Sequence, residues 1–372
     1  MAWISEANSS SYVNVATNVG GEIRNVSRNG TTVSFQYRAY IYQSTSAWSS
    51  NTWALWVEGN RNVVKNSGTN SSQGTKYYTG WYSKTVSLAT NSSYTTVSVG
   101  VAGKNYAASS PNGYVTLGVD GLPTAAAPSL SGLSISNVSD KSAKISFNIN
   151  NTNNASVTDS YIDLSLSNWG SVVKTISSRS GTFTGLDPNR TYYARGNAAN
   201  AAGRSYTSVS SFKTTFINPG APGKPSLSYD QPEPIPRAKI TGKWNAGTAG
   251  STAVAGYRVR LYKNGTQVEV VDTDSANTYY TFPKTLEEYG FEPGDVLAIG
   301  IYAYSKDWQG TKFFNGGGAS TAIVMSDNLT IVSDKYIWVS INGQSFNKHK
   351  MYVSINGGSF QEVRKEKFKV IQ

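Results

Sequence analysis

A duplicated segment near the C-terminus is the feature that most restricts how this chain can fold. Residues 339–346 read Val-Ser-Ile-Asn-Gly-Gln-Ser-Phe, and residues 353–360, fourteen positions later, differ from them only at the sixth residue. In each copy a short alternating strand pattern runs into Asn-Gly, a pair that tolerates the positive φ angles of a two-residue hairpin turn. We therefore predict a small C-terminal β-hairpin repeat, residues 335–372, whose two hairpins superpose and share one sheet.

Apolar and polar residues also alternate elsewhere, which predicts strands rather than helices. Val33, Phe35 and Tyr37 alternate with polar neighbours, and similar patterns follow near Leu55 and Val99. Only 15% of the 372 residues are charged, whereas Gly (35) and Tyr (24) are abundant, so good helix formers are scarce. A chain of this length exceeds one domain of ~100–200 residues. We predict an all-β fold of tandem β-sandwich domains.

Two proline-containing stretches, residues 122–128 and 219–225, divide the chain. The predicted units are an N-terminal β-sandwich at 1–123, further sandwiches at 129–216 and 226–327, and the hairpin repeat at 335–372. Because linkers expose backbone that strands protect, we expect proteases to cut first at 125–127 and 219–220.

The second unit contains the segment Thr-Gly-Leu-Asp-Pro-Asn-Arg-Thr-Tyr-Tyr-Ala-Arg at 184–195. This segment resembles the corner between the fifth and sixth strands of fibronectin type III domains. The resemblance places Leu186, Pro188 and Tyr192 at the corner positions, and it implies a buried Tyr192 ring whose hydroxyl bonds to nearby backbone. The third unit is similar to the same family or to immunoglobulin-like domains, with Trp244 as the core tryptophan and Leu297 in place of the tyrosine.

Residues suited to catalysis are few. The chain has no cysteine and one histidine, His349, which lies between two lysines. Neither a histidine-based triad nor a zinc site is indicated, and no paired-carboxylate signature is visible. We predict that the chain is not an enzyme and binds no cofactor or metal. No export signal is evident and no apolar run approaches the ~20 residues of a membrane span, so we expect no membrane span.

Charge and aromatic residues indicate the possible partners. The net charge of +11 favours anionic partners, but it is spread along the chain apart from the basic C-terminal region, where a solvated basic edge is the simpler explanation. We expect no nucleic-acid partner.

Five of the nine tryptophans fall in the first 81 residues. Exposed aromatic rings there would either stack on sugars or pack against another subunit, and the sequence leaves both open. The candidate glycan or interface residues are Tyr40, Tyr42, Trp53, Trp56, Tyr78 and Trp81. By alternation, Trp53 and Trp56 should point to opposite sheet faces, and either Trp56 or the outward pair Tyr40 and Tyr42 should be partly exposed if the unit binds glycan. The candidate tail interface comprises Trp338, Phe346, Tyr352 and Phe360.

The repeated hairpins have the form aromatic-Val-x-Ile-Asn-Gly-x-x-aromatic, and they resemble hairpins that end tail proteins of tailed bacteriophages of Gram-positive hosts. This resemblance implies a virion structural component of the tail or baseplate adsorption apparatus. The expected partners are other virion proteins and further copies of the same chain, and the expected location is the virion. The alternative is a receptor-binding or decoration protein that binds host cell-wall polysaccharide or teichoic acid. A bacterial surface adhesin is less favoured, because no signal peptide or wall anchor is evident.

Overall fold

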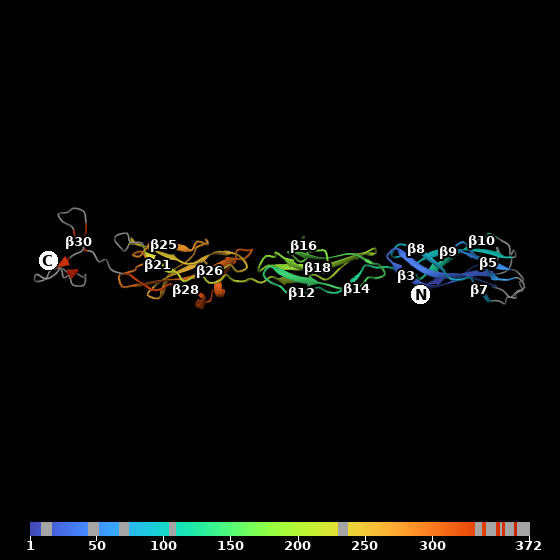
Figure 1. Cartoon of the computed structure of the whole chain (residues 1–372), viewed down its shortest axis with the longest axis horizontal. Coiled ribbons are helices and arrows are strands. Elements are labelled where there is room, and N and C mark those ends of the chain that lie inside the picture. Colours follow the sequence, from blue (N-terminus) through green and yellow to red (C-terminus); the bar gives the residue numbers. More distant parts are fainter. Residues whose placement is uncertain are drawn as a thin grey trace. The chain divides into compact units, whose positions relative to one another are not determined.

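The computed structural model confirms an almost entirely β fold (Figure 1). It describes residues 1–8, 17–43, 52–66, 74–103, 109–229 and 237–331, and the backbone of 337–339, 347–349, 352–353 and 361–362. Short 3₁₀ turns, η2 (Asn315–Gly318) and η3 (Ser320–Ala322), are the helical elements of the described part. The chain divides into two compact units, one of residues 1–137, 143–183 and 191–212 and the other of residues 138–142, 184–190 and 213–372.

The first sandwich consists of two five-stranded antiparallel sheets. One sheet has the order β1 (Trp3–Ile4), β10 (Gly113–Asp120), β9 (Thr95–Gly103), β5 (Trp53–Val57) and β6 (Asn60–Lys65). The other has the order β2 (Ala7–Asn8), β3 (Thr17–Asn29), β4 (Thr32–Gln43) and β7 (Lys76–Tyr78), and β8 (Tyr82–Ser87) also pairs with β4.

The core of this sandwich follows from the alternation along β4. Val33, Phe35 and Tyr37 are each at most 2% exposed, and they pack against Leu55 and Val99 of the opposite sheet, which are fully buried. Burying an aliphatic or aromatic side chain contributes about 1.5–3 kcal/mol, so a shift of β4 by one residue would turn this whole set toward water.

The second sandwich pairs three strands with four. One sheet is β12 (Ser134–Ser136), β13 (Ser142–Ser146) and β17 (Ser180–Thr184), and the other is β16 (Val172–Ile176), β15 (Val157–Ser165), β18 (Thr191–Asn200) and β19 (Gly203–Tyr206). In addition β20 (Ser210–Lys213) pairs with β18, and β11 (Ser129–Leu130) pairs with β14 (Ile149–Asn151).

The third sandwich repeats this order of strands. Its sheets are β21 (Ser226–Tyr229), β22 (Lys239–Lys243) and β25 (Tyr279–Thr285), and then β24 (Thr266–Asp272), β23 (Val254–Lys263), β26 (Val296–Lys306) and β27 (Lys312–Phe314). Two short strands, β28 (Val324–Met325) and β29 (Leu329–Thr330), also pair with β26. If β11 and β14 are set aside, strands one, two and five form one sheet in both sandwiches, and strands four, three, six and seven form the other. The two sandwiches therefore share one topology.

The residues of the fibronectin-like corner are buried, as the resemblance implies. Leu186 and Tyr192 are each 3% exposed, Pro188 is buried, and the Tyr192 ring stacks on Phe212 at a centroid distance of 5.7 Å. The backbone bond of the Tyr192 hydroxyl stays a prediction. In the third sandwich Trp244 packs edge-on against Tyr257, and Leu297 is fully buried at the position expected for the tyrosine.

The C-terminal repeat forms two hairpins with the same register. Strand β30 (Ile337–Val339) pairs with β31 (Asn347–His349), and β32 (Tyr352–Val353) pairs with β33 (Gln361–Glu362). Trp338 lies opposite Lys348, and Tyr352, at the matching position of the second copy, lies opposite Glu362.

Two details of the predicted repeat are wrong. The described strands form two separate two-stranded sheets, not one shared sheet. Val339 pairs with Asn347, whereas an uninterrupted two-residue turn would pair it with Phe346. Phe346 and Phe360 lie outside the described residues, and only backbone is described for Trp338 and Tyr352.

The first proline-containing stretch is not the exposed linker that its composition indicates. The Leu122 amide donates to the Ser93 carbonyl (3.0 Å) and the Ala125 amide donates to the Thr90 carbonyl (2.8 Å). The Ala126 carbonyl accepts from the Asn200 side chain (2.8 Å). Proteases need accessible, unpaired backbone, so these hydrogen bonds disfavour the expected cleavage at 125–127.

The second stretch is fixed in the same way. The Gly220 amide donates to the Thr248 carbonyl and the Gly223 amide donates to the Asn245 carbonyl, both at 2.9 Å. Cleavage at 219–220 is therefore also disfavoured. The sequence pattern located both stretches but not their hydrogen bonds.

Candidate functional site

Aromatic and basic side chains alternate on the outer face of the β3-β4-β7 sheet. The Lys76 ammonium lies 4.0 Å from the Tyr40 ring centroid, and the Arg38 guanidinium lies 4.0 Å from that of Tyr78 and 4.9 Å from that of Trp81. The Arg24 guanidinium also lies over the Trp81 ring, 4.0 Å from its centroid. We call this set, with Tyr42, the cation–π face: Arg24, Arg38, Tyr40, Tyr42, Lys76, Tyr78 and Trp81.

Two carboxylates neutralise much of this face. Glu6 accepts hydrogen bonds from the hydroxyls of Tyr40 and Tyr42. Partial burial alone would raise the pKa of Glu6, but these bonds and the charge of Lys76 outweigh it and lower the pKa. Glu22 accepts from Arg38 (2.7 Å) and Tyr78 (2.8 Å), and its pKa is lowered because these bonds outweigh the effect of burial. The face is therefore an internally paired network.

Burial removes three of the six predicted aromatic residues from consideration as open stacking platforms. Tyr40 is only 3% exposed because Gly20 lies beneath it, where an added Cβ would stand 2.5 Å from the ring. Trp53 is fully buried in the core, where its ring meets Tyr77 edge-on, and Trp56 is 7% exposed. Opposite orientation of the two tryptophans is confirmed, because Trp53 belongs to the sandwich core and Trp56 to a small outer cluster.

The remaining predicted aromatics are half-buried. Tyr42, Tyr78 and Trp81 keep some exposure, but guanidinium groups already cover faces of the Tyr78 and Trp81 rings. A sugar would have to displace these cations in order to stack. The cation–π face is thus better suited to stabilising the sheet surface than to receiving a ligand.

A shallow depression on the opposite sheet includes only one of the residues that the sequence singled out, Trp56. It is lined by Trp56, Glu58, Lys84, Ser98, Pro111 and Tyr114, among others, and we call it the Tyr114 depression. Tyr114 is 62% exposed, the most exposed aromatic side chain among the described residues. Its position in β10, between the inward residues Val115 and Gly113 of an alternating strand, could have signalled an outward ring.

Cross-strand register explains how the depression forms. Gly100 of β9 lies opposite both Tyr114 of β10 and Trp56 of β5, so the two aromatic residues flank a glycine. A Cβ at Gly100 would stand 2.8 Å from Pro111 and 3.1 Å from the Trp56 Cβ. Pro111 can approach the sheet here only because residue 100 is a glycine.

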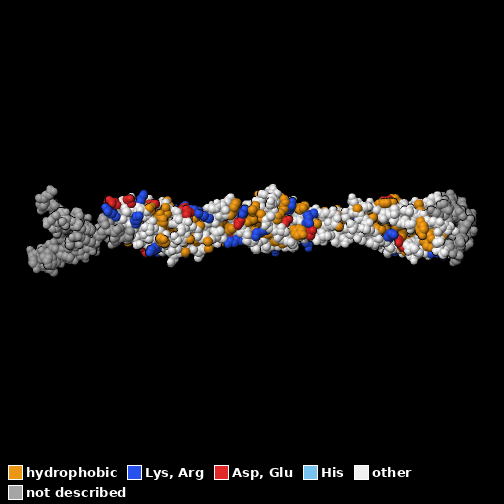
Figure 2. All heavy atoms as spheres, turned by 90° about the horizontal axis from the view of Figure 1, so that it is seen from above, with side chains coloured by type: hydrophobic (Ala, Val, Ile, Leu, Met, Phe, Trp, Pro, Cys, Tyr) orange, Lys and Arg blue, Asp and Glu red, His pale blue; other side chains and the backbone are white. Residues whose placement is uncertain are grey.

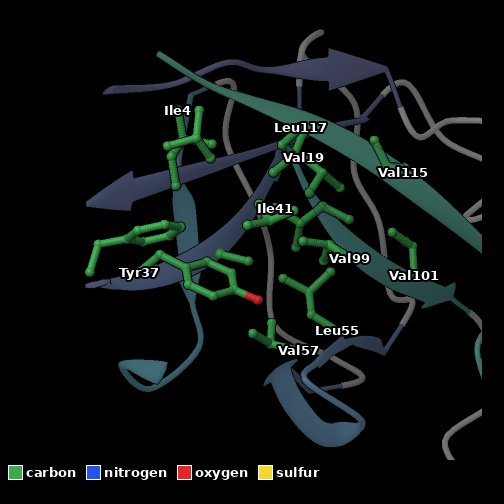
Figure 3. Packing of buried hydrophobic residues seen from close by; sticks show 14 of the residues in the cluster. Ile4, Val19, Tyr37, Ile41, Leu55, Val57, Val99, Val101, Val115 and Leu117 are labelled. Carbon is green, nitrogen blue, oxygen red and sulfur yellow. The ribbon is translucent and has the colours of Figure 1, made fainter. Parts of the chain in front are cut away.

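Glu58 is the acidic group of the depression, and two donors hold it in place. The hydroxyl of Tyr37, whose ring lies in the core (Figure 3), donates to Glu58 Oε1 at 2.7 Å, and Lys84 donates to the same oxygen at 2.8 Å. These bonds, from Lys84 first and then Tyr37, lower the pKa of Glu58. Within the described ranges, no side chain or backbone group donates to Oε2.

A second depression lies on the third sandwich, lined by Tyr262, Val296, Ala298 and Met325 among others, and its lining contains no charged residue. Figure 2 shows charges of both signs interspersed with apolar side chains on the viewed face. Among the described residues, no three His, Asp or Glu side chains gather as a metal site. The same residues contain no helix with the length and apolar character required to cross a bilayer.

Comparison with known proteins adds little to this description. No protein-family model matches the chain, and a search of curated proteins finds no match. Among solved structures the chain is similar to the crystal structure of chicken CNTN1 FN1-FN3 domains, at 12% identity, over 84% of this chain and 97% of that chain, with a TM-score of 0.25. So low a score supports no argument about function. The strand orders and the buried corner define the class: a multidomain all-β protein that contains two sandwiches of fibronectin type III-like topology.

Proposed function

We propose that the chain is a virion structural component of the tail or baseplate adsorption apparatus of a tailed bacteriophage with a Gram-positive host. The observation that carries the proposal is the C-terminal repeat, whose two hairpins have the same register fourteen residues apart. A two-stranded hairpin is marginally stable alone. Two such hairpins in series are therefore suited to docking on another protein, which in this proposal is a neighbouring virion subunit.

Hydrogen bonds between successive sandwiches support a role as a spacer. At the first junction the Gly30 amide donates to the Asn154 carbonyl (2.8 Å), and the Ser156 amide donates to the Asn29 side chain (2.7 Å). A spacer that presents modules at a defined place needs junctions that resist bending, and short bonded linkers supply this resistance.

Comparable contacts occur within the second compact unit, between residues 189–190 of the corner and residues 307–308. The Asn189 side chain donates to Asp307 (2.7 Å), and the Arg190 guanidinium lies 4.2 Å from the Trp308 ring centroid. Asn189 adopts a left-handed conformation, with φ of 57°, at the tip of the fibronectin-like corner. The corner therefore contacts Asp307 and Trp308 in addition to closing its own sandwich.

Deletion of residues 335–372 tests the proposal. We expect the truncated chain to keep the circular dichroism and thermal unfolding of the sandwiches but to be absent from assembled phage particles. A matched control, Gln344→Gly, gives the first hairpin the residue found at the same position of the second and should be incorporated normally. Normal incorporation of the truncated chain would show that the repeat has no part in docking.

A second candidate function is binding of host cell-wall glycan. It is favoured by one observation, the exposed Tyr114 ring beside a fixed carboxylate. The cation–π face favours it less, since its rings and charges are already paired.

A further inference from the structure

We propose that the Tyr114 depression is a binding site for a neutral sugar ring of a glycan. This inference deepens the second candidate function, and it does not depend on incorporation of the chain into a virion. Three features of the depression carry it: an exposed aromatic ring, a carboxylate oriented by two donors, and the pairing of Lys84 in the described lining with that carboxylate.

The aromatic ring supplies the apolar contact. One face of a pyranose carries several C–H groups with partial positive charge, and these are attracted to the negative face of an aromatic ring. Tyr114 offers such a ring at 62% exposure, and no cation–π partner covers it among the described contacts. Pro111, which packs on Gly100, and Trp56, one strand beyond it, form the opposite wall, so a flat ring can lie over the exposed Tyr114 ring with its edge against Pro111.

Glu58 supplies the hydrogen-bond acceptor. Sugar hydroxyls are donors, and an ionised carboxylate accepts more strongly than a neutral group. Tyr37 and Lys84 both bond to Oε1 and so fix the direction of the carboxylate while Oε2 can still accept. The Ser98 hydroxyl, on the exposed side of β9, can donate or accept beside it.

Backbone conformation at Glu58 points the same way. Glu58 and Gly59 form the turn between β5 and β6 with φ of 46° and 76°, whereas Asn264 and Gly265 form the corresponding turn of the third sandwich with φ of 48° and 80°. Asparagine suits the first position of this turn, and glutamate is strained there. Glu58 thus keeps a strained backbone conformation at the depression. A function at this place explains why such strain is retained.

Local charge selects a neutral ligand over a phosphate polymer. Lys84 is paired with Glu58, and Arg61 lies over the Trp56 ring at 5.7 Å. An anionic chain would meet the Glu58 carboxylate at close range, and the lysine of the described lining, Lys84, is already paired with that carboxylate. A neutral hexose or N-acetylhexosamine meets no such repulsion.

Isothermal titration of the full chain tests the site. The probes are defined neutral oligosaccharides of hexoses and N-acetylhexosamines, first screened on an array, and synthetic poly(glycerol phosphate) as the anionic arm. We expect a neutral oligosaccharide to bind, and Tyr114→Ala to weaken its binding about tenfold or more, as truncation of an aromatic anchor does. Glu58→Gln should weaken it about fivefold, whereas Tyr114→Phe, which keeps the ring, should change it less than about twofold.

Two further variants separate binding from folding. Ser98→Tyr fills the depression from an exposed strand position and should abolish binding without altering thermal unfolding. Tyr94→Ala removes a ring of comparable exposure, 49%, outside the depression and should bind as the parent chain does. No binding by any neutral oligosaccharide, binding of the phosphate polymer alone, or equal binding by the parent chain, Tyr114→Ala and Ser98→Tyr would each overturn the proposal. Particle incorporation is measured separately, so either proposal can fail without the other.

Discussion

At the scale of single residues, Arg28 shows what pattern reading cannot find. It occupies a polar position of β3, yet it is only 9% exposed. Its guanidinium donates to the carbonyls of Gly30 (2.7 Å), Ser92 (2.7 Å) and Pro123 (2.8 Å). These acceptors come from three separate segments, so no local sequence signal could have marked Arg28 as a structural residue.

Arg28→Lys should therefore destabilise the first sandwich. A lysine has fewer donors and no fork geometry, so several buried carbonyls lose their partner, and the free energy of unfolding should fall by about 3 kcal/mol. Denaturant unfolding followed by tryptophan fluorescence measures this change. Arg179→Lys, at an exposed arginine of the second sandwich, is the control and should have little effect. A loss equal to that of the control would show that the carbonyls find other donors.

Asp274 gives the third sandwich a defined acid sensitivity. Hydrogen bonds from Tyr304 (2.8 Å) and Lys306 (3.1 Å), and the nearby Lys312, lower the pKa of Asp274 from 3.8 to about 2. Because the folded pKa lies below the unfolded one, this stabilisation is complete above about pH 4 and is lost as the pH falls toward 2. Thermal unfolding between pH 5 and pH 2, as approximate limits, should show the melting temperature falling in this window. Asp274→Asn should flatten the dependence, and an unchanged slope would assign the effect to other carboxylates.

At the scale of elements, turns with left-handed residues are the best predicted features of the chain. Asn264-Gly265, a pair typical of two-residue hairpin turns, joins β23 to β24 with both φ angles positive. Strand alternation succeeded equally along β4, because one face is completely buried. Alternation also placed Trp56 outward, but not its burial: Trp56 packs with Ala54 of its own strand and with Ala102 of β9, and the second contact is not contained in the periodicity of one strand.

Replacing Asn264 separates two contributions to that turn. Its side chain donates to Asp295 (2.7 Å) and accepts from the Val296 amide (2.8 Å), and its φ is 48°. Asn264→Gly removes the side-chain bonds only and should cost about 1 kcal/mol. Asn264→Ala adds the left-handed penalty and should cost about 2–3 kcal/mol in total. Equal losses in the two variants, measured by denaturant unfolding, would show that the backbone conformation is not the main contribution.

At the scale of the whole molecule, composition located the sandwiches but misjudged the segments between them. Proline and alanine at 122–128 indicate a loose linker, and the same residues are also short enough to lie close against neighbouring strands. What fixes the segment is Asn200, which is 74 positions away from Ala126 and only 7% exposed. Pairings over such separations follow from the topology of the sandwich, which local composition does not encode.

Asn200→Ala should convert this junction into the protease-sensitive linker that the sequence indicated. Asn200 donates to the carbonyls of Ala126 and Thr152, both at 2.8 Å, and its oxygen accepts from the Ala202 amide (2.9 Å). Without these bonds the segment at 125–127 should open locally, and elastase, which cuts after small residues, should release a fragment ending there. Mass spectrometry of timed digests identifies the fragment. The parent chain and Asn148→Ala, at an exposed asparagine, should resist cleavage at this place over the same period. Cleavage of the parent chain as fast as the variant would mean that the hydrogen bonds of Asn200 do not protect the junction, and the proposed spacer would then lack its first stiff joint.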